Sequence, residues 1–162
     1  RREILTSPSL KEKVIEIIEA GIDELMFIYC PEDRYREEWD IKGLREAYYG
    51  LFGFVPEGVG ETEGIDALRE QLRKSAVDYY EAKEREFSAE LMRRVEKMIM
   101  LQVVDNQWKD HLLAMDHLKE GIGLRGYGQR DPLVEYKREA YDMFADMTER
   151  INTEILTRLF RI

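Results

Sequence analysis

Apolar residues recur at steps of three and four along most of this chain, which is the spacing of one face of an α-helix. In the first half, this pattern predicts helices over residues 10–30 and 41–52. The second of these starts after Asp40 as its N-cap and is closed by Gly53. A glycine-rich loop follows at residues 53–64. The N-terminal part is therefore predicted to be a group of helices of modest length.

Residues 65–120 contain neither proline nor glycine, and helix-favouring residues dominate them. One helix of that length would extend over roughly 84 Å. That is about twice the diameter of a compact globule of this size. We therefore predict a break near Phe87 and Ser88, where Ser88 caps a new helix that carries Glu90 in its first turn.

Two long apolar stripes of helical spacing lie beyond Ser88. The first helix is expected to stop at Gly121, and the second to start after Asp131 as N-cap with Pro132 in the first turn. Two long helices joined by a short loop, residues 121–131, predict an antiparallel helical hairpin. The stripes are Leu91, Val95, Met98, Leu101, Val104, Trp108, Leu112, Met115, Leu118 and Ile122, then Ala140, Phe144, Met147, Ile151, Ile155 and Leu159.

Several apolar residues on the two hairpin helices lie off these stripes, and seven of them concern us here. Pairing the stripes with each other leaves them without a role, so they predict additional packing partners, with a region outside this chain as one candidate. They are Met92, Ile99, Val103, Leu113, Met143, Leu156 and Phe160.

The fold class is predicted to be all-α, because no segment alternates apolar and polar residues with the period of two that a half-buried strand requires. We expect a small helical domain over residues 1–87. The long antiparallel hairpin follows within residues 88–162, with its tip loop at 121–131.

Charge and composition narrow the classes of function. The net charge is −9, of which −8 lies in residues 1–66, and such an acidic chain is not expected to bind nucleic acid through its phosphates. The single cysteine, Cys30, cannot form an internal disulfide, and its presence alone favours a reducing, cytoplasmic setting. The chain starts with Arg1 rather than methionine, so we expect a piece of a longer protein.

Candidate cofactor and metal motifs do not fit their surroundings. The string at residues 121–126 has the GxGxxG spacing of dinucleotide-binding loops, but that motif follows a parallel strand and here a helix precedes it. An enzyme that used this loop would show saturable dinucleotide binding. His111 and His117, six residues apart on one helix, do not converge on a metal ion. No catalytic site, cofactor or metal is predicted for this chain.

The tip loop combines an aromatic ring with polar and basic side chains. Tyr127 lies between two glycines, and Arg125, Gln129 and Arg130 accompany it. An aromatic ring with a polar end suits adaptable contacts with a partner of variable sequence. The alternative is that Tyr127 folds back onto the hairpin, or onto a neighbouring domain, and only rigidifies the turn.

Residues 88–160 contain three specific strings: LQVVDNQWKDHLLAMDHL at 101–118, GIGLRGYGQRDP at 121–132 and EYKRE at 135–139. Together they resemble the C-terminal region of the SecA family, the ATP-driven motors of bacterial preprotein translocation. Residues 1–87 are more loosely similar to the helical wing domain of that family, through WDI at 39–41 and GL at 43–44. Residues 1–5 resemble the last turn of the scaffold helix that precedes the wing.

The resemblance implies that residues 88–162 belong to the helical scaffold with its two-helix finger. Tyr127, with Arg125, Gln129 and Arg130 around it, would contact an unfolded preprotein at the SecY channel complex. The finger helices would pack together and would contact and regulate the ATPase domains of the parent. The residues implied in this role are Trp108, Leu112, Met115 and Phe144. ATP and Mg²⁺ would be bound in those domains and not here. The parent is expected in the cytoplasm, peripherally associated with the inner membrane.

A different class of function stays open at this point. A stand-alone helical adaptor would use its exposed apolar stripe to bind a partner helix or a second copy of the chain as a homodimer. Oligomeric state, measured with and without the remaining motor domains, distinguishes the two.

Overall fold

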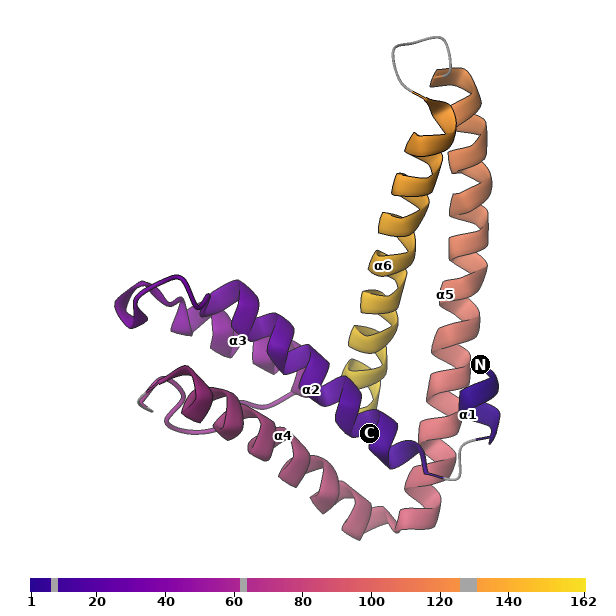
Figure 1. Ribbon diagram of the computed structural model, residues 1–162. Helices are drawn as coiled ribbons and strands as arrows, with labels where there is room; N and C mark the ends of the chain where they lie inside the picture. Colours follow the sequence, from indigo (N-terminus) through magenta and orange to yellow (C-terminus); the bar gives the residue numbers. More distant parts are fainter. Residues whose placement is uncertain (7–8, 62–63, 126–130) are drawn as a thin grey trace.

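The computed structural model describes residues 1–6, 9–61, 64–125 and 131–162, the side chain of Arg125 excepted. Every regular element in these ranges is a helix, so the all-α prediction is confirmed. The helices form two arms that meet at an angle (Figure 1). We call the arm of α2, α3 and α4 the wing, and the arm of α5 and α6 the hairpin. Across the described ranges, none of the helices has the length and apolar character needed to cross a bilayer.

The wing helices are α2 (Leu10–Tyr29), α3 (Ile41–Phe52) and α4 (Ile65–Phe87), and their bounds agree closely with the predicted ranges. A short 3-10 turn, Arg36–Glu38, lies between α2 and α3 and was not predicted, because three residues are too few to show a period. The wing thus consists of three helices packed side by side, with α2 contacting both α3 and α4.

Local chemistry sets both ends of α3. The Asp40 side chain accepts a hydrogen bond from the Gly43 backbone N–H at 2.8 Å, as an N-cap residue does. Gly53 ends the helix in the left-handed region with a φ of 76°, which a residue without a Cβ adopts at little cost. Both caps confirm the predicted ones.

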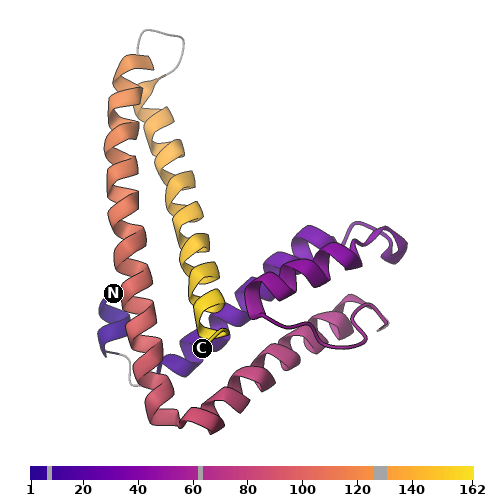
Figure 2. The same cartoon turned by 180° about the vertical axis from the view of Figure 1, so that it is seen from behind.

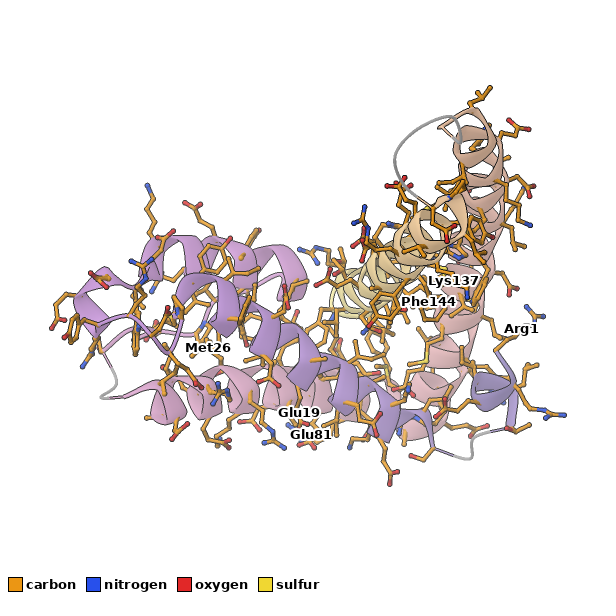
Figure 3. The ribbon with its side chains drawn as sticks, turned by 45° about the horizontal axis from the view of Figure 1, so that its top comes forward. Arg1, Glu19, Met26, Glu81, Lys137 and Phe144 are labelled. Atoms are coloured by element: carbon orange, nitrogen blue, oxygen red, sulfur yellow. The ribbon has the colours of Figure 1, made fainter. Side chains whose placement is uncertain are left out.

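Charged pairs join α2 to α4 along one edge of the wing. The Arg73 Nε of α4 lies 2.9 Å from Glu19 Oε1 of α2, and the Lys11 Nζ of α2 lies 3.6 Å from Glu81 Oε1 of α4. Figure 3 shows Glu19 and Glu81 along this edge, with Met26 further out in the wing. Surface pairs of this kind each contribute about 0–1 kcal/mol, so they help to fix the register of the two helices more than their stability.

The chain turns sharply between α4 and α5 (Ala89–Arg125) at Ser88, so the predicted break is confirmed. Ser88 has a φ of 83°, a backbone conformation that residues other than glycine rarely adopt. Its Oγ accepts a hydrogen bond from the Leu91 N–H at 3.2 Å, and its carbonyl accepts one from Met92 at 3.1 Å. The strained backbone is thus compensated by capping of α5. We call this turn the elbow.

The hairpin differs from the prediction at the end of α5. The helix passes Gly121 and ends at Arg125, four residues later than expected. Glycine in a helix costs only about 1 kcal/mol relative to alanine, and Ile122, buried at this end of the hairpin, favours continuation. The start of α6 (Pro132–Leu159) is as predicted, since the Asp131 side chain accepts a hydrogen bond from the Leu133 N–H at 3.0 Å.

The buried face of α5 is rotated from the predicted stripe near the base of the hairpin. Leu91 and Met98, which the stripe predicted to be buried, are exposed there, and so is Leu112 farther along the helix. Residues assigned no role in that stripe are buried instead: Met92, Ile99 and Val103. The stripe predicted on α6 agrees better with the structure, because Met147, Ile155 and Leu159 are buried as expected.

One hydrophobic core extends from the wing into the base of the hairpin. It contains residues of all three wing helices together with Met92 and Val103 of α5 and Leu156 and Phe160 near the end of α6. The partners that these off-stripe residues required are therefore provided by the wing of the same chain. Of the seven off-stripe residues, Leu113 alone is strongly exposed, and Met143 is half-buried.

A separate short helix, α1 (Arg2–Thr6), lies against α5, as seen from behind in Figure 2. Arg1 forms an ion pair with Asp105 of α5, and Ile4 packs against the edge of the core. Glu3 also lies 3.8 Å from Lys13 of α2, so the N-terminal residues attach to the hairpin and to the first wing helix.

Candidate functional site

The free end of the hairpin is the point of the molecule most distant from the wing (Figure 1). Of the predicted tip residues, Tyr127, Gln129 and Arg130 fall outside the described residues, and Arg125 is the last residue of α5. On one side of them lies Leu124, which is apolar and 84% exposed, and on the other lies Asp131, the N-cap of α6. On α6, Leu133 and Val134 are also exposed. The hairpin end therefore presents unburied apolar side chains beside the tip segment.

Further down, an aromatic cluster joins the two hairpin helices. Trp108 of α5 and Phe144 of α6 lie with ring centroids 6.0 Å apart, and His111 completes the cluster at 5.4 Å from Trp108 and 6.2 Å from Phe144. His111 is buried, whereas Trp108 and Phe144 remain 40% and 47% exposed. The structure thus brings together two of the four predicted packing residues. Figure 3 shows Phe144 on the hairpin, well away from the wing.

The other two predicted packing residues lie outside this cluster. Leu112 is exposed, because its position after His111 turns it away from α6, and Met115 is half-buried. Sequence reasoning missed His111 as a seam residue, although Val104, His111 and Leu118 are spaced by seven residues, as in a coiled-coil seam. The described residues contain no group of acidic, histidine or cysteine side chains arranged to hold a metal ion.

Polar side chains hold α5 and α6 in register just beyond the core. Arg158 donates to Gln102 Oε1 at 2.6 Å. Gln107 donates to Glu154 at 3.0 Å and accepts from Arg150 Nε at 3.2 Å. Because hydrogen bonds require specific geometry, these contacts oppose sliding of one helix along the other.

A partly buried ionic network lies beside the elbow. Arg93 reaches Glu84 Oε2 at 2.5 Å and Glu96 Oε2 at 2.9 Å, and Lys11 of α2 reaches Glu84 at 3.0 Å. The Tyr80 hydroxyl donates a short hydrogen bond to Glu96, which has no exposed surface. The Arg93 Nε and Glu96 Oε1 atoms are 2.7 Å apart as an ion contact without hydrogen-bond geometry. The network therefore connects α2, α4 and α5.

The two carboxylates of this network have opposite pKa shifts. Burial raises the pKa of Glu96, and the hydrogen bonds from Tyr80 and Arg93 offset this only in part. Burial also acts to raise the pKa of Glu84, but its hydrogen bonds to Lys11 and Arg93 outweigh it, so that pKa is lowered. The cost of removing charges from water offsets much of the attraction in such a network, so its main effect is on the relative placement of α2, α4 and α5 and less on the free energy of unfolding.

An acidic groove lies in the corner between the two arms. It has a volume of about 790 Å³ and is lined by α2, α6 and Gln107 of α5. Glu24 of α2 faces Glu149 of α6 there, and its pKa is raised by burial, by the neighbouring Glu149 charge and by a hydrogen bond with Glu149.

Known proteins match this chain from end to end. A family model described as SecA Wing and Scaffold domain matches residues 1–162. The protein translocase subunit SecA of Thermodesulfovibrio yellowstonii is 47% identical over 162 residues, which cover 100% of this chain and 18% of that protein. The corresponding subunit of Pelotomaculum thermopropionicum is 46% identical over 168 residues, 100% of this chain and 19% of that protein. The subunit of Geotalea uraniireducens is 44% identical over 163 residues, 99% of this chain and 18% of that protein.

These matches agree with the two-armed fold and with the strings that suggested the resemblance. The chain spans about a fifth of the length of the curated relatives it matches. On the family model and on the relatives alike, this chain belongs to the SecA wing and scaffold family.

Proposed function

We propose that this chain is the non-catalytic lever of an ATP-driven protein translocase, with the hairpin as a finger whose tip contacts the moving polypeptide. The observation that supports it most is the asymmetry of the hairpin. Its base is embedded in the core shared with the wing, whereas its far end presents exposed side chains such as Leu124 and Leu133. A rigid base and a free contact end are what a lever requires. The relatives bear the name protein translocase subunit.

The tip contact has to be weak and tolerant of sequence, because a motor that bound one side chain tightly would not release the next. Tyr127 with Arg125, Gln129 and Arg130 supplies an aromatic ring and hydrogen-bonding groups of that kind. Single hydrogen bonds contribute about 0.5–1.5 kcal/mol net, and contacts of that size exchange readily. The substrate would be an unfolded preprotein entering the SecY channel complex.

The exposed apolar side chains along the hairpin are proposed to contact the ATPase domains of the longer protein. The rings of Trp108 and Phe144 are in contact, and Leu112 lies one helical turn beyond Trp108 on α5. Tyr141, also exposed, lies one turn before Phe144 on α6. Nucleotide and Mg²⁺ would be bound in those domains. Movement driven by hydrolysis there would reach the tip through α5 and α6.

A photo-crosslinking residue in place of Tyr127 in the full-length protein tests this proposal. A preprotein is held midway through ATP-driven transport, and adducts are mapped. We expect adducts that require the trapped preprotein and that shift along it as transport proceeds. The matched control is the same residue at Asp116, an exposed position on the shaft of α5. Adducts from position 127 to the translocase alone would contradict the proposal and make the tip a structural turn.

A stand-alone adaptor that dimerises is the second candidate, favoured by the exposed Leu112, Leu113 and Phe144 on the hairpin. Light scattering with and without the ATPase domains distinguishes it. A dimer that persists when those domains are present supports the adaptor, and a monomer that associates with them supports the lever.

A further inference from the structure

Arg161, just beyond α6, connects the end of the hairpin to the wing. Its guanidinium donates to the carbonyl oxygens of Gly50 at 2.8 Å, Tyr49 at 3.1 Å and Leu51 at 3.3 Å, all in the last turn of α3. It also donates to the Thr157 carbonyl of α6 at 3.1 Å. One side chain therefore binds the C-terminal ends of two helices from different arms.

The physical chemistry of helix ends explains why arginine suits this position. The last four carbonyl groups of a helix have no partner within it and carry the negative end of the helix dipole. Here the ends of α3 and α6 come together, so two sets of such carbonyls face one another. A permanently charged planar group with five N–H donors satisfies both sets at once, which lysine with its single point charge cannot do.

The neighbouring Phe160 inserts into the wing. Its ring is 1% exposed, and its centroid lies 4.9 Å from that of Phe52 in α3 and 5.6 Å from that of Tyr80 in α4. Lys83 of α4 donates to the Phe160 carbonyl at 3.0 Å and to the Ile162 carbonyl. Burial lowers the pKa of Lys83, and the neighbouring Glu86 charge offsets this only in part. We call Phe160 and Arg161 together the latch.

The latch adds to the other attachments between the arms. At the elbow the chain itself continues from α4 through Ser88 into α5, and the shared core and the ionic network also join the wing to the base of the hairpin. The elbow and the network act on α5, whereas the latch binds the end of α6 to α3 and so opposes rotation of the wing about the elbow.

We propose that Arg161 is a positioning residue: through the latch it fixes the angle between the wing and the hairpin, and thereby the place to which the hairpin tip is delivered. The effect on transport rests on the proposed lever function. The effect on the angle does not, so the two are tested separately.

The first test measures the angle in the full-length protein with Arg161→Met, which keeps the aliphatic stem and removes the donors. Spin labels at Lys42→Cys on α3 and Asp116→Cys on α5, both exposed, report the distance between the arms by electron double resonance. We expect a broadened distance distribution in Arg161→Met. The matched control is Arg158→Met in the same last turn, whose contacts are to Gln102 and Glu154 inside the hairpin, and which should keep the parent distribution. An unchanged distribution in Arg161→Met would overturn the latch.

The second test measures residues transported per ATP hydrolysed. With Arg161→Met we expect this ratio to fall roughly fivefold, the lower end of typical coupling between sites, while ATP hydrolysis and the melting temperature stay close to those of the parent. Arg161→Lys should restore part of the ratio. A broadened distribution with an unchanged ratio would overturn the positioning role and leave the crosslinking test of the tip unaffected. Absence of preprotein adducts from position 127 in the protein that keeps Arg161 would instead refute the lever function itself.

Discussion

The wing with the base of the hairpin is stabilised differently from the distal half of the hairpin. In the first region, fully buried side chains such as Tyr48, Phe52 and Leu72 are enclosed by α2, α3, α4, the start of α5 and the end of α6. In the second, beyond Val103 of α5 and before Ile151 of α6, the buried residues in the described ranges form a single seam: Val104, His111, Leu118, Ile122 and Met147. A helix with several neighbours is locked in place, whereas a helix with one neighbour relies on one line of contacts. The base is therefore the rigid part of the molecule and the distal hairpin the more easily opened one.

The largest effect is expected at the junction of the two regions, from Phe160→Ala. Removing a fully buried aromatic ring creates a cavity between the wing and the hairpin base and should cost about 3–5 kcal/mol of unfolding free energy. Urea unfolding followed by circular dichroism measures it. Loss of stability should be accompanied by one cooperative transition, because the core is shared. Two separate transitions in the unmodified protein would show that the wing and base are independent units.

The elbow network should respond almost as strongly to Glu96→Ala. This change leaves the Tyr80 hydroxyl and part of the Arg93 guanidinium buried without their partner, at a cost of about 3 kcal/mol. Chemical denaturation is the measurement. Glu90→Ala, which removes an exposed partner of Arg94 in the first turn of the same helix, is the control and should change stability by no more than about 1 kcal/mol. Equal losses of stability in the two variants would show that the network contributes no more to the free energy of unfolding than an exposed ion pair does.

In the distal hairpin, Leu118→Ala should cost about 2 kcal/mol, and its effect should be confined to that half. Hydrogen exchange should quicken in α5 beyond Val104 and in the first turns of α6, while amides of α2 and α4 keep their protection. If α2 and α4 lose protection equally, the contrast between a rigid base and an independently opening hairpin is wrong.

The elbow carboxylates predict two opposite responses to pH. Because the folded-state pKa of Glu96 is raised, its stabilising contribution is present below the unfolded-state pKa and is lost as pH rises through the folded-state value. For Glu84 the pKa is lowered, so its contribution is present above the unfolded-state pKa and is lost as pH falls through the folded-state value. The slope of unfolding free energy against pH should therefore become more positive than that of the parent in Glu96→Gln and less positive in Glu84→Gln. The same sign in both variants would contradict these shifts.

The smallest effect on stability is expected from Leu112→Ala, whose side chain is 60% exposed. We expect a change within about 0.5 kcal/mol. If this position contacts another domain in the longer protein, the same change should alter ATP hydrolysis there while leaving the melting temperature of the parent unchanged. A loss of stability in this chain above 1 kcal/mol would mean that Leu112 packs within the hairpin.

Helix ends were predictable where one residue determines them. Asp40, Gly53 and Asp131 act through hydrogen bonds or backbone conformation within a few residues, so the sequence around them contains the whole cause. The end of α5 was not predictable in this way. Gly121 is a helix terminator only if nothing downstream is buried, and Ile122 is buried against the partner helix.

The buried face of α5 was less predictable because this helix is apolar on more than one side. Adjacent residues on a helix differ by about 100°, so Leu91 and Met92 define two different faces of equal apolar character. The wing covers the face with Met92, and nothing local to α5 records where the wing lies. Arg161 and Glu96 were missed for a related reason: the partners that bury or anchor them, the end of α3 and Tyr80 of α4, lie on other helices, and a charged residue on a helix ordinarily faces solvent.

The amino-acid sequence by itself determined the helices, the break at Ser88, the hairpin and the family, because helix periodicity, capping and characteristic strings are local properties of the chain. The tertiary structure alone decided which face of α5 is buried, that one core joins the wing to the hairpin base, and that Arg161 binds the ends of two helices. Those features depend on contacts between residues up to 112 positions apart. Such contacts exist only after the arms have come together, so no pattern along the chain specifies them.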